Sequence, residues 1–253
     1  MAIVWKKTVG GVCYEVRAAG NTRRLYTDGV FHSQYNPNNP VTGSIWDLLL
    51  LPAFFYPQDY LKRILVLGVG GGAVLKQFNY FLQPRDIVGV ELNPVHLNIA
   101  KRFFKLTQKN ITLYEADAVQ WLQAYRGEPF DLIVDDLFGE HDGEPVRAVK
   151  ANRVWARTLL AHLATDGLVV TNFVSSHELQ QSAYVQALDI RQRFSCAFQL
   201  MAPRYENAIG AFLKKPSSNR ILQQNLMTMP HLDPTKKTCK LSYYLQRIYV
   251  NGE

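Results

Sequence analysis

The spacing of hydrophobic positions along the chain changes near residue 63. Before it, residues 12–17 and 23–32 alternate between apolar and polar side chains, which is typical of half-buried β-strands. Beyond it, short apolar runs alternate with helical patterns, as in a parallel sheet buried on both faces. The pattern predicts strands at 63–67, 87–91, 111–115, 130–135, 167–173, 196–201 and 207–213, and helices at 72–82, 94–106, 118–125, 150–164 and 178–193.

These elements predict an α/β fold. We expect a Rossmann-like, mostly parallel twisted sheet with helices on both faces and a small N-terminal β-element. A β-hairpin and a Pro- and Asn-rich loop take up residues 1–43, the main domain residues 44–213, and a basic helical tail residues 214–253. Within the main domain, residues 44–56 are expected to form an apolar helix that ends near Pro52.

Composition narrows the class of protein. A chain of 253 residues with 47% hydrophobic content can bury a substantial core. Its net charge of +7 comes largely from the tail, without interleaved aromatic stacking motifs, so nucleic acid is not indicated as a partner, although the basic tail leaves it open. The cysteines Cys13, Cys196 and Cys239 are far apart and outside any CxxC pattern, so we expect neither a disulfide framework nor a metal site.

Neither a signal peptide nor a membrane span is predicted. The chain starts with MAIVWKKTVGG, which has no apolar region between its first charges and a cleavage site, and no run of about 18 apolar residues occurs. The expectation is a cytoplasmic protein without membrane attachment.

A glycine-rich turn follows the first strand of the predicted sheet. Ligands of open parallel sheets bind beyond the carboxyl ends of the strands, and residues without Cβ atoms let the backbone approach a ligand closely. The same glycines also suit a sharp strand-to-helix turn without a ligand. The candidate ligand-binding residues in this turn are Gly68, Gly70, Gly71 and Gly72.

An acidic residue ends the second strand. Glu91 lies 23 residues after Gly68, where a carboxylate can accept two hydrogen bonds from the vicinal hydroxyls of a ribose. The alternative is a residue that precedes the helix entry at Asn93 and Pro94. Because Gly68, Gly70 and Ala73 also satisfy G-x-G-x-x-A, a nicotinamide-dependent oxidoreductase is a further alternative.

Two further strand ends carry carboxylates. Asp117 and Ala118 follow the third strand. There Asp117 either accepts a hydrogen bond from the exocyclic amine of an adenine or forms a capping box with Gln120. Asp135 and Asp136 end the fourth strand, and only one of them can point into a site because side chains alternate along a strand. We choose Asp136 as base or orienting group, with Asp135 as the alternative; one of them can instead cap the following loop.

The segment after the fourth strand is acidic in a basic chain. It carries five carboxylates and no Lys or Arg, so it either attracts a cationic small-molecule acceptor such as an amine or is a solvated loop. The carboxylates are Asp135, Asp136, Glu140, Asp142 and Glu144.

Together these motifs resemble the spermidine-synthase-like group of the class I S-adenosylmethionine-dependent methyltransferase superfamily. The resemblance covers roughly residues 12–213. Motifs common to the superfamily are RILVLGVGGGAVL, VGVELNP and YEADAVQWL, and the narrower group is indicated by RRLYTDGVFHSQ, FDLIVDD and PRYENAIGAFL. It implies a class I methyltransferase fold, with residues 44–213 as an adenosyl-binding transferase domain, and a homodimer formed through the N-terminal β-element.

The resemblance also implies roles for individual residues. Glu91 matches the ribose ligand and Asp117 the adenine ligand. Asp136 matches the carboxylate that helps the attacking amine lose its proton, and Tyr205 matches a polyamine-contacting tyrosine, so Tyr205 joins Asp136 as a candidate catalytic residue. The donor is then S-adenosylmethionine or its decarboxylated form.

The chain departs from that group at several acidic positions. A second Asp three places after the catalytic one is replaced here by Gly139, and an Asp in the glycine loop falls on Gly71 or a neighbour. The acidic stretch with a Tyr-Gln pair falls on NPNNPVT. These losses place methyl transfer to an amine or other cationic acceptor ahead of aminopropyl transfer to a polyamine, with a non-catalytic nucleoside-binding module as a third hypothesis.

Overall fold

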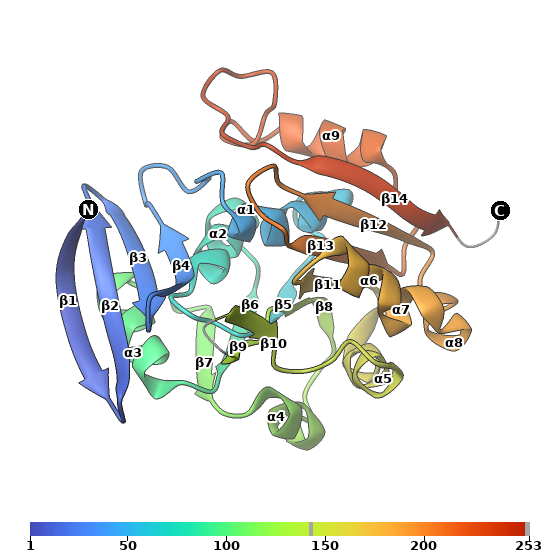
Figure 1. The fold of residues 1–253 in the computed structure, drawn as a ribbon. Coiled ribbons are helices and arrows are strands. Elements are labelled where there is room, and N and C mark those ends of the chain that lie inside the picture. Colours follow the sequence, from blue (N-terminus) through green and yellow to red (C-terminus); the bar gives the residue numbers. More distant parts are fainter. Residues whose placement is uncertain (142–143, 251–253) are drawn as a thin grey trace.

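Within the described residues, 1–141 and 144–250, a twisted eight-stranded sheet runs through the molecule and a four-stranded sheet stands beside it (Figure 1). In this computed structural model the strand order of the central sheet is β14-β12-β13-β11-β8-β5-β6-β7. Its strands are β5 (Arg63–Leu67), β6 (Asp86–Glu91), β7 (Ile111–Glu115), β8 (Phe130–Asp135), β11 (Leu163–Phe173), β12 (Cys196–Met201), β13 (Ala208–Leu213) and β14 (Tyr244–Val250).

The five strands from β7 to β11 are parallel, and β13, β12 and β14 continue the sheet in antiparallel pairs. Alternate side chains of β5 pack into two separate apolar clusters, Ile64 and Val66 on one face and Leu65 and Leu67 on the other. Helices α2, α3 and α9 cover the first face, and α4 and α5 cover the second. The expected Rossmann-like α/β fold with helices on both faces is confirmed.

Polar residues at the helix starts explain where several helices begin. Asn93, Asn152 and Ser218 each accept a backbone N–H of the first helical turn through the side-chain oxygen. The helices are α1 (Ile45–Leu50), α2 (Ala73–Phe81), α3 (Pro94–Phe103), α4 (Ala118–Ala124), α5 (Arg153–Ala161), α6 (Ser176–Gln181), α7 (Ala183–Gln186), α8 (Leu188–Arg191) and α9 (Asn219–Met227), with a 3₁₀ helix, η1, at Leu51–Phe55.

The N-terminal element, expected as a β-hairpin or a small sheet, is a small sheet. It is an antiparallel sheet of β1 (Ala2–Val9), β2 (Val12–Ala19), β3 (Thr22–Thr27) and β4 (Val30–Tyr35) in sequence order. The pattern analysis missed β1 because this edge strand is almost wholly exposed and therefore has no buried face to produce alternation.

Two other segments differ from the expectation. The predicted helix at 178–193 is divided among α6, α7 and α8, because the backbone is extended at Ser182 and Ala187. The tail is only partly helical, since β14 follows α9 and pairs with the edge strand β12. The domain boundaries themselves stay a prediction.

A short hairpin follows β8. Strands β9 (Phe138–His141) and β10 (Glu144–Arg147) pair antiparallel where a loop was expected. None of the helices in the described part of the chain has the length and apolar character needed to cross a membrane.

Candidate active site

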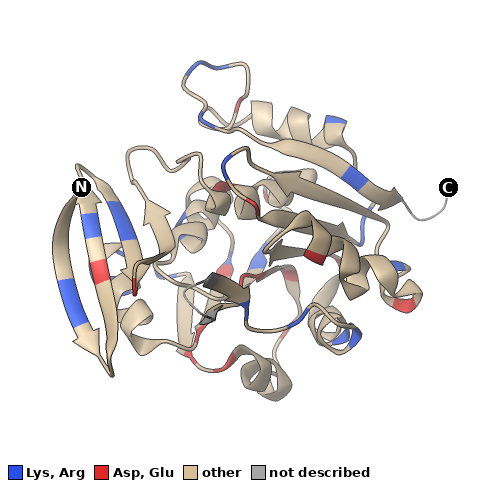
Figure 2. Ribbon diagram, in the orientation of Figure 1, with Lys and Arg blue, Asp and Glu red and all other residues tan. Residues whose placement is uncertain are grey.

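A cavity of about 900 Å³ opens beyond the carboxyl ends of the parallel strands. Its floor is formed by the residues at the ends of β5, β6, β7, β8 and β11, and its walls by the β3–β4 turn, the start of α1 and the β9–β10 hairpin. Figure 2 shows carboxylate residues gathered around this part of the sheet. Of the predicted site residues, those that line the cavity are Gly68, Gly70, Glu91, Asp117, Ala118, Asp136 and Tyr205.

The glycine turn after β5 lies in close contact with the backbones of Asp136 and His32. Gly68 has φ +88° and lies so close to the carbonyl oxygen of Asp136 that a Cβ atom could not fit between them. At Gly70, with φ +52°, a Cβ would lie 3.2 Å from the carbonyl oxygen of His32. These two glycines therefore let the turn lie between the fourth parallel strand and the N-terminal sheet.

Gly71 and Gly72 lie behind the cavity instead of lining it, so their predicted place in the ligand site is not supported. A Cβ at Gly71 would lie 2.7 Å from the ring of Phe104 and 2.8 Å from Cβ of Ser33, and one at Gly72 would lie 2.5 Å from the side chain of Leu106. Packing of α2 against its neighbours accounts for both positions.

Glu91 is fixed by backbone hydrogen bonds at the end of β6. Its Oε2 accepts the N–H groups of Val69 and Gly70, each at 2.9 Å, and its Oε1 accepts the N–H of Asn93 at 2.9 Å. The carboxylate thus ties the glycine turn to the entry of α3 and faces the cavity in one orientation. This suits the predicted ribose contact and also agrees with a role at the helix entry.

Asp117 caps a helix and also lines the cavity. It precedes α4 and accepts the N–H of Gln120 at 2.9 Å, as a helix cap does, while it lines the cavity together with Ala118. One carboxylate oxygen makes the cap. The predicted adenine contact stays a prediction.

The two aspartates at the end of β8 point in opposite directions, as strand alternation requires. Asp136 lines the cavity and accepts Nδ2 of Asn172 at 2.8 Å. Asp135 is fully buried on the other face, where it accepts Nη2 of Arg147 at 2.7 Å and Nε1 of Trp155 at 2.9 Å. The alternative catalytic choice of Asp135 is therefore not supported, because a buried ion pair holds its carboxylate away from the cavity.

Burial raises the pKa of Asp136 to about 7. The hydrogen bond from Asn172 opposes this rise and the charge of Arg147 does too, whereas the charges of Asp135 and Glu91 add to it. A carboxylate whose pKa lies near neutrality is a stronger proton acceptor than an ordinary aspartate and is still ionised at physiological pH in a large part of the molecules.

Aromatic side chains form the opposite wall. Tyr205 comes from the turn between β12 and β13, and its backbone N–H bonds to the carbonyl of Ala202 at 3.2 Å. Phe31 of β4 and Trp46 of α1 contact each other edge to face with ring centroids 4.9 Å apart. Part of the cavity can therefore hold apolar carbon chains beside the carboxylates.

Two histidines belong to the cavity, although the sequence gave no sign of them. The rings of His32 and His96 lie 5.0 Å apart, and Nε2 of His96 is 2.8 Å from the hydroxyl of Thr27. Burial lowers the pKa of each to about 4, so both are neutral at pH 7. In the described residues no group of three or more His, Cys, Asp or Glu side chains could hold a metal ion.

Part of the acidic segment lies outside the described residues. This applies to Asp142 and to the side chains of Glu140 and Glu144. The hairpin backbone on either side does reach the cavity through Gly139 and Pro145.

Known proteins resemble the chain over most of its length. The polyamine aminopropyltransferase of Chromobacterium violaceum is 25% identical over 207 residues, which cover 80% of this chain and 77% of the relative. A probable spermidine synthase from Corynebacterium glutamicum superposes with a TM-score of 0.74 at 16% identity, covering 98% of this chain and 91% of that one. No family model matches the sequence.

A more distant solved structure belongs to the methyltransferases. Human methyltransferase-like protein 13 in complex with SAH has a TM-score of 0.59 at 15% identity, covering 71% of this chain and 87% of that one. The chain therefore has the class I S-adenosylmethionine-dependent methyltransferase fold and, within it, resembles the spermidine-synthase-like group.

Proposed function

We propose that this protein is a transferase that moves an aminopropyl group from decarboxylated S-adenosylmethionine to an amine, with a polyamine as the acceptor. The sequence motifs had placed methyl transfer first because acidic acceptor positions are missing. The relatives favour the opposite order, since a protein named a polyamine aminopropyltransferase matches four fifths of the chain.

The observation that carries the proposal is the charge of the cavity. Its described lining residues include four acidic ones, Asp28, Glu91, Asp117 and Asp136, and no Lys or Arg. Residues 142–143 and 251–253, which the structure does not describe, include no Lys or Arg either. The carboxylate of S-adenosylmethionine would find no cationic side chain here, whereas a donor without it carries only positive charge and is attracted.

The chain supplies a proton acceptor for the transfer. The acceptor amine is an ammonium ion in neutral water, so it first gives a proton to the carboxylate of Asp136. The nitrogen lone pair that this exposes attacks the aminopropyl carbon bonded to the sulfonium sulfur, the carbon–sulfur bond breaks, and its electron pair goes to sulfur to give a neutral thioether. The new nitrogen–carbon bond leaves the product amine as a cation, and Asp136 later returns its proton to solvent. Its pKa of about 7 places this acceptor near the working pH.

The remaining residues hold the two substrates in line. Glu91 is placed to accept hydrogen bonds from ribose hydroxyls and Asp117 to accept one from the adenine amine, while Gly68 and Gly70 let the turn that faces the donor lie against the backbones of Asp136 and His32. Tyr205 lines the same cavity and would contact the acceptor chain. Orientation of this kind contributes much of the rate of a transfer whose donor carries its own leaving group.

Calorimetric titration with the two donors tests the proposal. Decarboxylated S-adenosylmethionine is expected to bind at least ten-fold more tightly than S-adenosylmethionine, about 1.4 kcal/mol or more. With 1,4-diaminobutane present, methylthioadenosine should accumulate. Tighter binding of S-adenosylmethionine, together with S-adenosylhomocysteine as the product, would restore methyl transfer; turnover of neither donor would favour a nucleoside-binding module.

The setting of the reaction is proposed on the resemblance alone. We infer a cytoplasmic homodimer that pairs through the N-terminal sheet, with a small amine rather than a macromolecule as the acceptor.

A further inference from the structure

Three side chains from separate elements are joined at the cavity wall. Nδ2 of Asn172, near the end of β11, donates to Oδ1 of Asp136 at 2.8 Å. Nδ2 of Asn207, just before β13, donates to Oδ1 of Asn172 at 3.0 Å. All three side chains line the cavity. Hydrogen bonds therefore run in one direction, from Asn207 through Asn172 to the proposed base.

The direction of the bonds fixes the amide of Asn172. An amide has a donor end and an acceptor end, whereas an ionised carboxylate only accepts. If the Asn172 amide were reversed, its oxygen would face the carboxylate of Asp136 and its nitrogen would face the nitrogen of Asn207. The ionised carboxylate of Asp136 requires the nitrogen of Asn172, and the donation from Asn207 to Oδ1 of Asn172 supports the same orientation.

The backbone of Asn172 is also anchored. Its carbonyl accepts Nη1 of Arg147 at 2.6 Å, and the guanidinium, with only 2% of the side chain exposed, is itself bonded to Asp135. In the antiparallel pair of β11 and β13, Asn172 lies opposite Ile209. The amide therefore projects from a rigid position toward Asp136.

Only one oxygen of the Asp136 carboxylate, Oδ1, accepts the hydrogen bond from Asn172. Among the described residues, Asn172 supplies the one side-chain hydrogen bond to this carboxylate. Oδ1 is held, and Oδ2 is left for a ligand in the cavity. Such an arrangement orients a base without using up its proton-accepting oxygen.

We propose that Asn172 is a positioning residue for Asp136 and that Asn207 acts through it by fixing its amide, so that the free carboxylate oxygen faces the acceptor amine. This rests on the proposed function for the identity of the acceptor, but the link between the three side chains does not depend on it.

The link predicts that removing the Asn172 amide changes the pH dependence of the reaction rate. Donation from Asn172 favours the ionised form of Asp136, as the charge of Arg147 does, while burial and the charges of Asp135 and Glu91 oppose it. Loss of the Asn172 amide should therefore raise the pKa of Asp136. Because the base must be ionised to accept a proton, the acid limb of the rate profile should move to higher pH.

The experiment compares Asn172→Ala, Asn207→Ala and the double variant with the unmodified protein. For Asn172→Ala we expect kcat near pH 7 to fall about ten-fold, the acid limb to rise by about one pH unit, and the donor affinity to stay within a factor of about two. Asn207→Ala should produce a smaller change in the same direction. The double variant should match Asn172→Ala, because Asn207 has no further route to the base.

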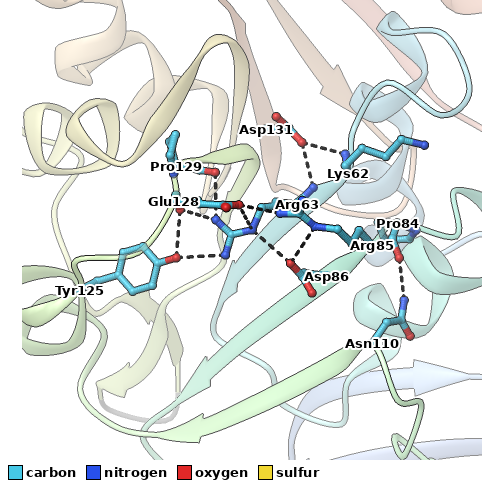
Figure 3. A network of polar contacts seen from close by, with 10 residues as sticks. All are labelled: Lys62, Arg63, Pro84, Arg85, Asp86, Asn110, Tyr125, Glu128, Pro129 and Asp131. Atoms are coloured by element: carbon cyan, nitrogen blue, oxygen red, sulfur yellow. Dashed lines mark hydrogen bonds and ion pairs between the residues drawn. The ribbon is translucent and has the colours of Figure 1, made fainter.

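A matched control removes an asparagine hydrogen bond elsewhere. Nδ2 of Asn110 donates to the carbonyl of Pro84 at 2.8 Å at the amino end of the sheet (Figure 3), so Asn110→Ala should leave the pH profile unchanged. Asn207→Ala tests the link should Asn172→Ala fail to fold.

Carboxyl carbon NMR titration of Asp136 separates this proposal from the proposed function. A raised pKa in Asn172→Ala supports the link even if the protein turns over no amine. An unchanged Asp136 pKa in the folded Asn variants, or effects of Asn172→Ala and Asn207→Ala that simply add, overturns it.

Discussion

Charged side chains have different partners at the two ends of the parallel sheet. At the amino end, Arg63 donates to Asp86 and to the hydroxyl of Tyr125, at 3.2 and 3.1 Å, and the carboxylate of Asp131 accepts the backbone N–H groups of Lys62 and Arg63 at 2.8 Å (Figure 3). At the carboxyl end, carboxylates line the cavity without a cationic side chain among its described residues.

The charged groups at the amino end stabilise the fold, whereas those at the carboxyl end are available for a reaction. Charges that have partners hold neighbouring strands and loops together and leave nothing for a ligand. A buried carboxylate whose pKa is raised, such as that of Asp136, raises the free energy of the folded protein when it is ionised, and it can attract a cation from solution. The same strand contains both cases, since Asp131 lies near the start of β8 and Asp136 directly follows its end.

Asp136→Asn is expected to have the largest effect. An amide cannot accept the proton of the amine, so kcat should fall by about 10²–10⁴, while the donor affinity should change little because Glu91 and Asp117 are intact. Single-turnover rates and calorimetric titration measure the two quantities. The matched control is Asp131→Asn on the same strand, which should leave kcat unchanged; full activity of Asp136→Asn would remove this residue from the mechanism.

Arg63→Met is expected to have an intermediate effect, and this effect is on stability and not on kcat. The variant loses the hydrogen bonds to Asp86 and Tyr125 and the contact of the guanidinium with the ring of Phe130, 4.9 Å away. We expect a loss of about 2 kcal/mol in unfolding free energy, or roughly 4–8 °C in Tm, with kcat unchanged.

Arg85→Met is the matched control for Arg63→Met. Arg85, like Arg63, forms ion pairs with Asp86 and Glu128. Its side chain is 58% exposed, so the loss in unfolding free energy should be smaller. A fall in kcat for Arg63→Met at unchanged stability would contradict the separation of the two ends.

The smallest expected effect is a gain in stability on removing the charge of Asp136. Its pKa in the folded protein, about 7, lies above the ordinary value of 3.8, so the folded state binds the proton more tightly than the unfolded state. Stability is therefore lost as pH rises from about 4 to about 7. Asp136→Asn avoids this loss, which the whole pKa difference would put at about 4 kcal/mol, but it still buries a polar amide, and this offsets much of the gain. Its Tm at pH 8 should therefore exceed that of the unmodified protein by about 2–4 °C, which corresponds to ~1 kcal/mol.

Calorimetric scans at pH 5 and pH 8 measure this gain, which should shrink at the lower pH. For Asp131→Asn no gain is expected at either pH, because its carboxylate accepts two backbone N–H groups. Equal gains of Asp136→Asn at both pH values would show that the charge of Asp136 is not their cause.

Local patterns were sufficient to predict the parallel sheet and its acidic strand ends. The strands at 63–67, 111–115 and 130–135 have the predicted bounds, and two of them, RILVL and FDLIVD, contain a buried apolar run. Strand alternation also correctly predicted that Asp135 and Asp136 would face opposite ways. Exposed edge strands such as β1 and β14 were missed, since neither has a fully buried face to mark it.

The rest of the site depends on contacts between distant residues. Asn172 lies 35 positions before Asn207 and 36 after Asp136, and nothing in the spacing relates them. His32 and His96 meet only because the N-terminal sheet packs against α3. Gly71 and Gly72 were included in the ligand site because a sequence does not distinguish a glycine that faces a ligand from one that faces a neighbouring side chain.

The close approach of Gly68 to the carbonyl of Asp136 joins two functions in one backbone contact. Any side chain at position 68 would displace both the turn that receives the nucleoside and the peptide that carries the base. Substitutions at Phe31, Trp46 or Tyr205 would therefore change the aromatic wall of the cavity, whereas the distance between the donor carbon and the base is set by the spacing of two adjacent main chains and changes only if the sheet itself does.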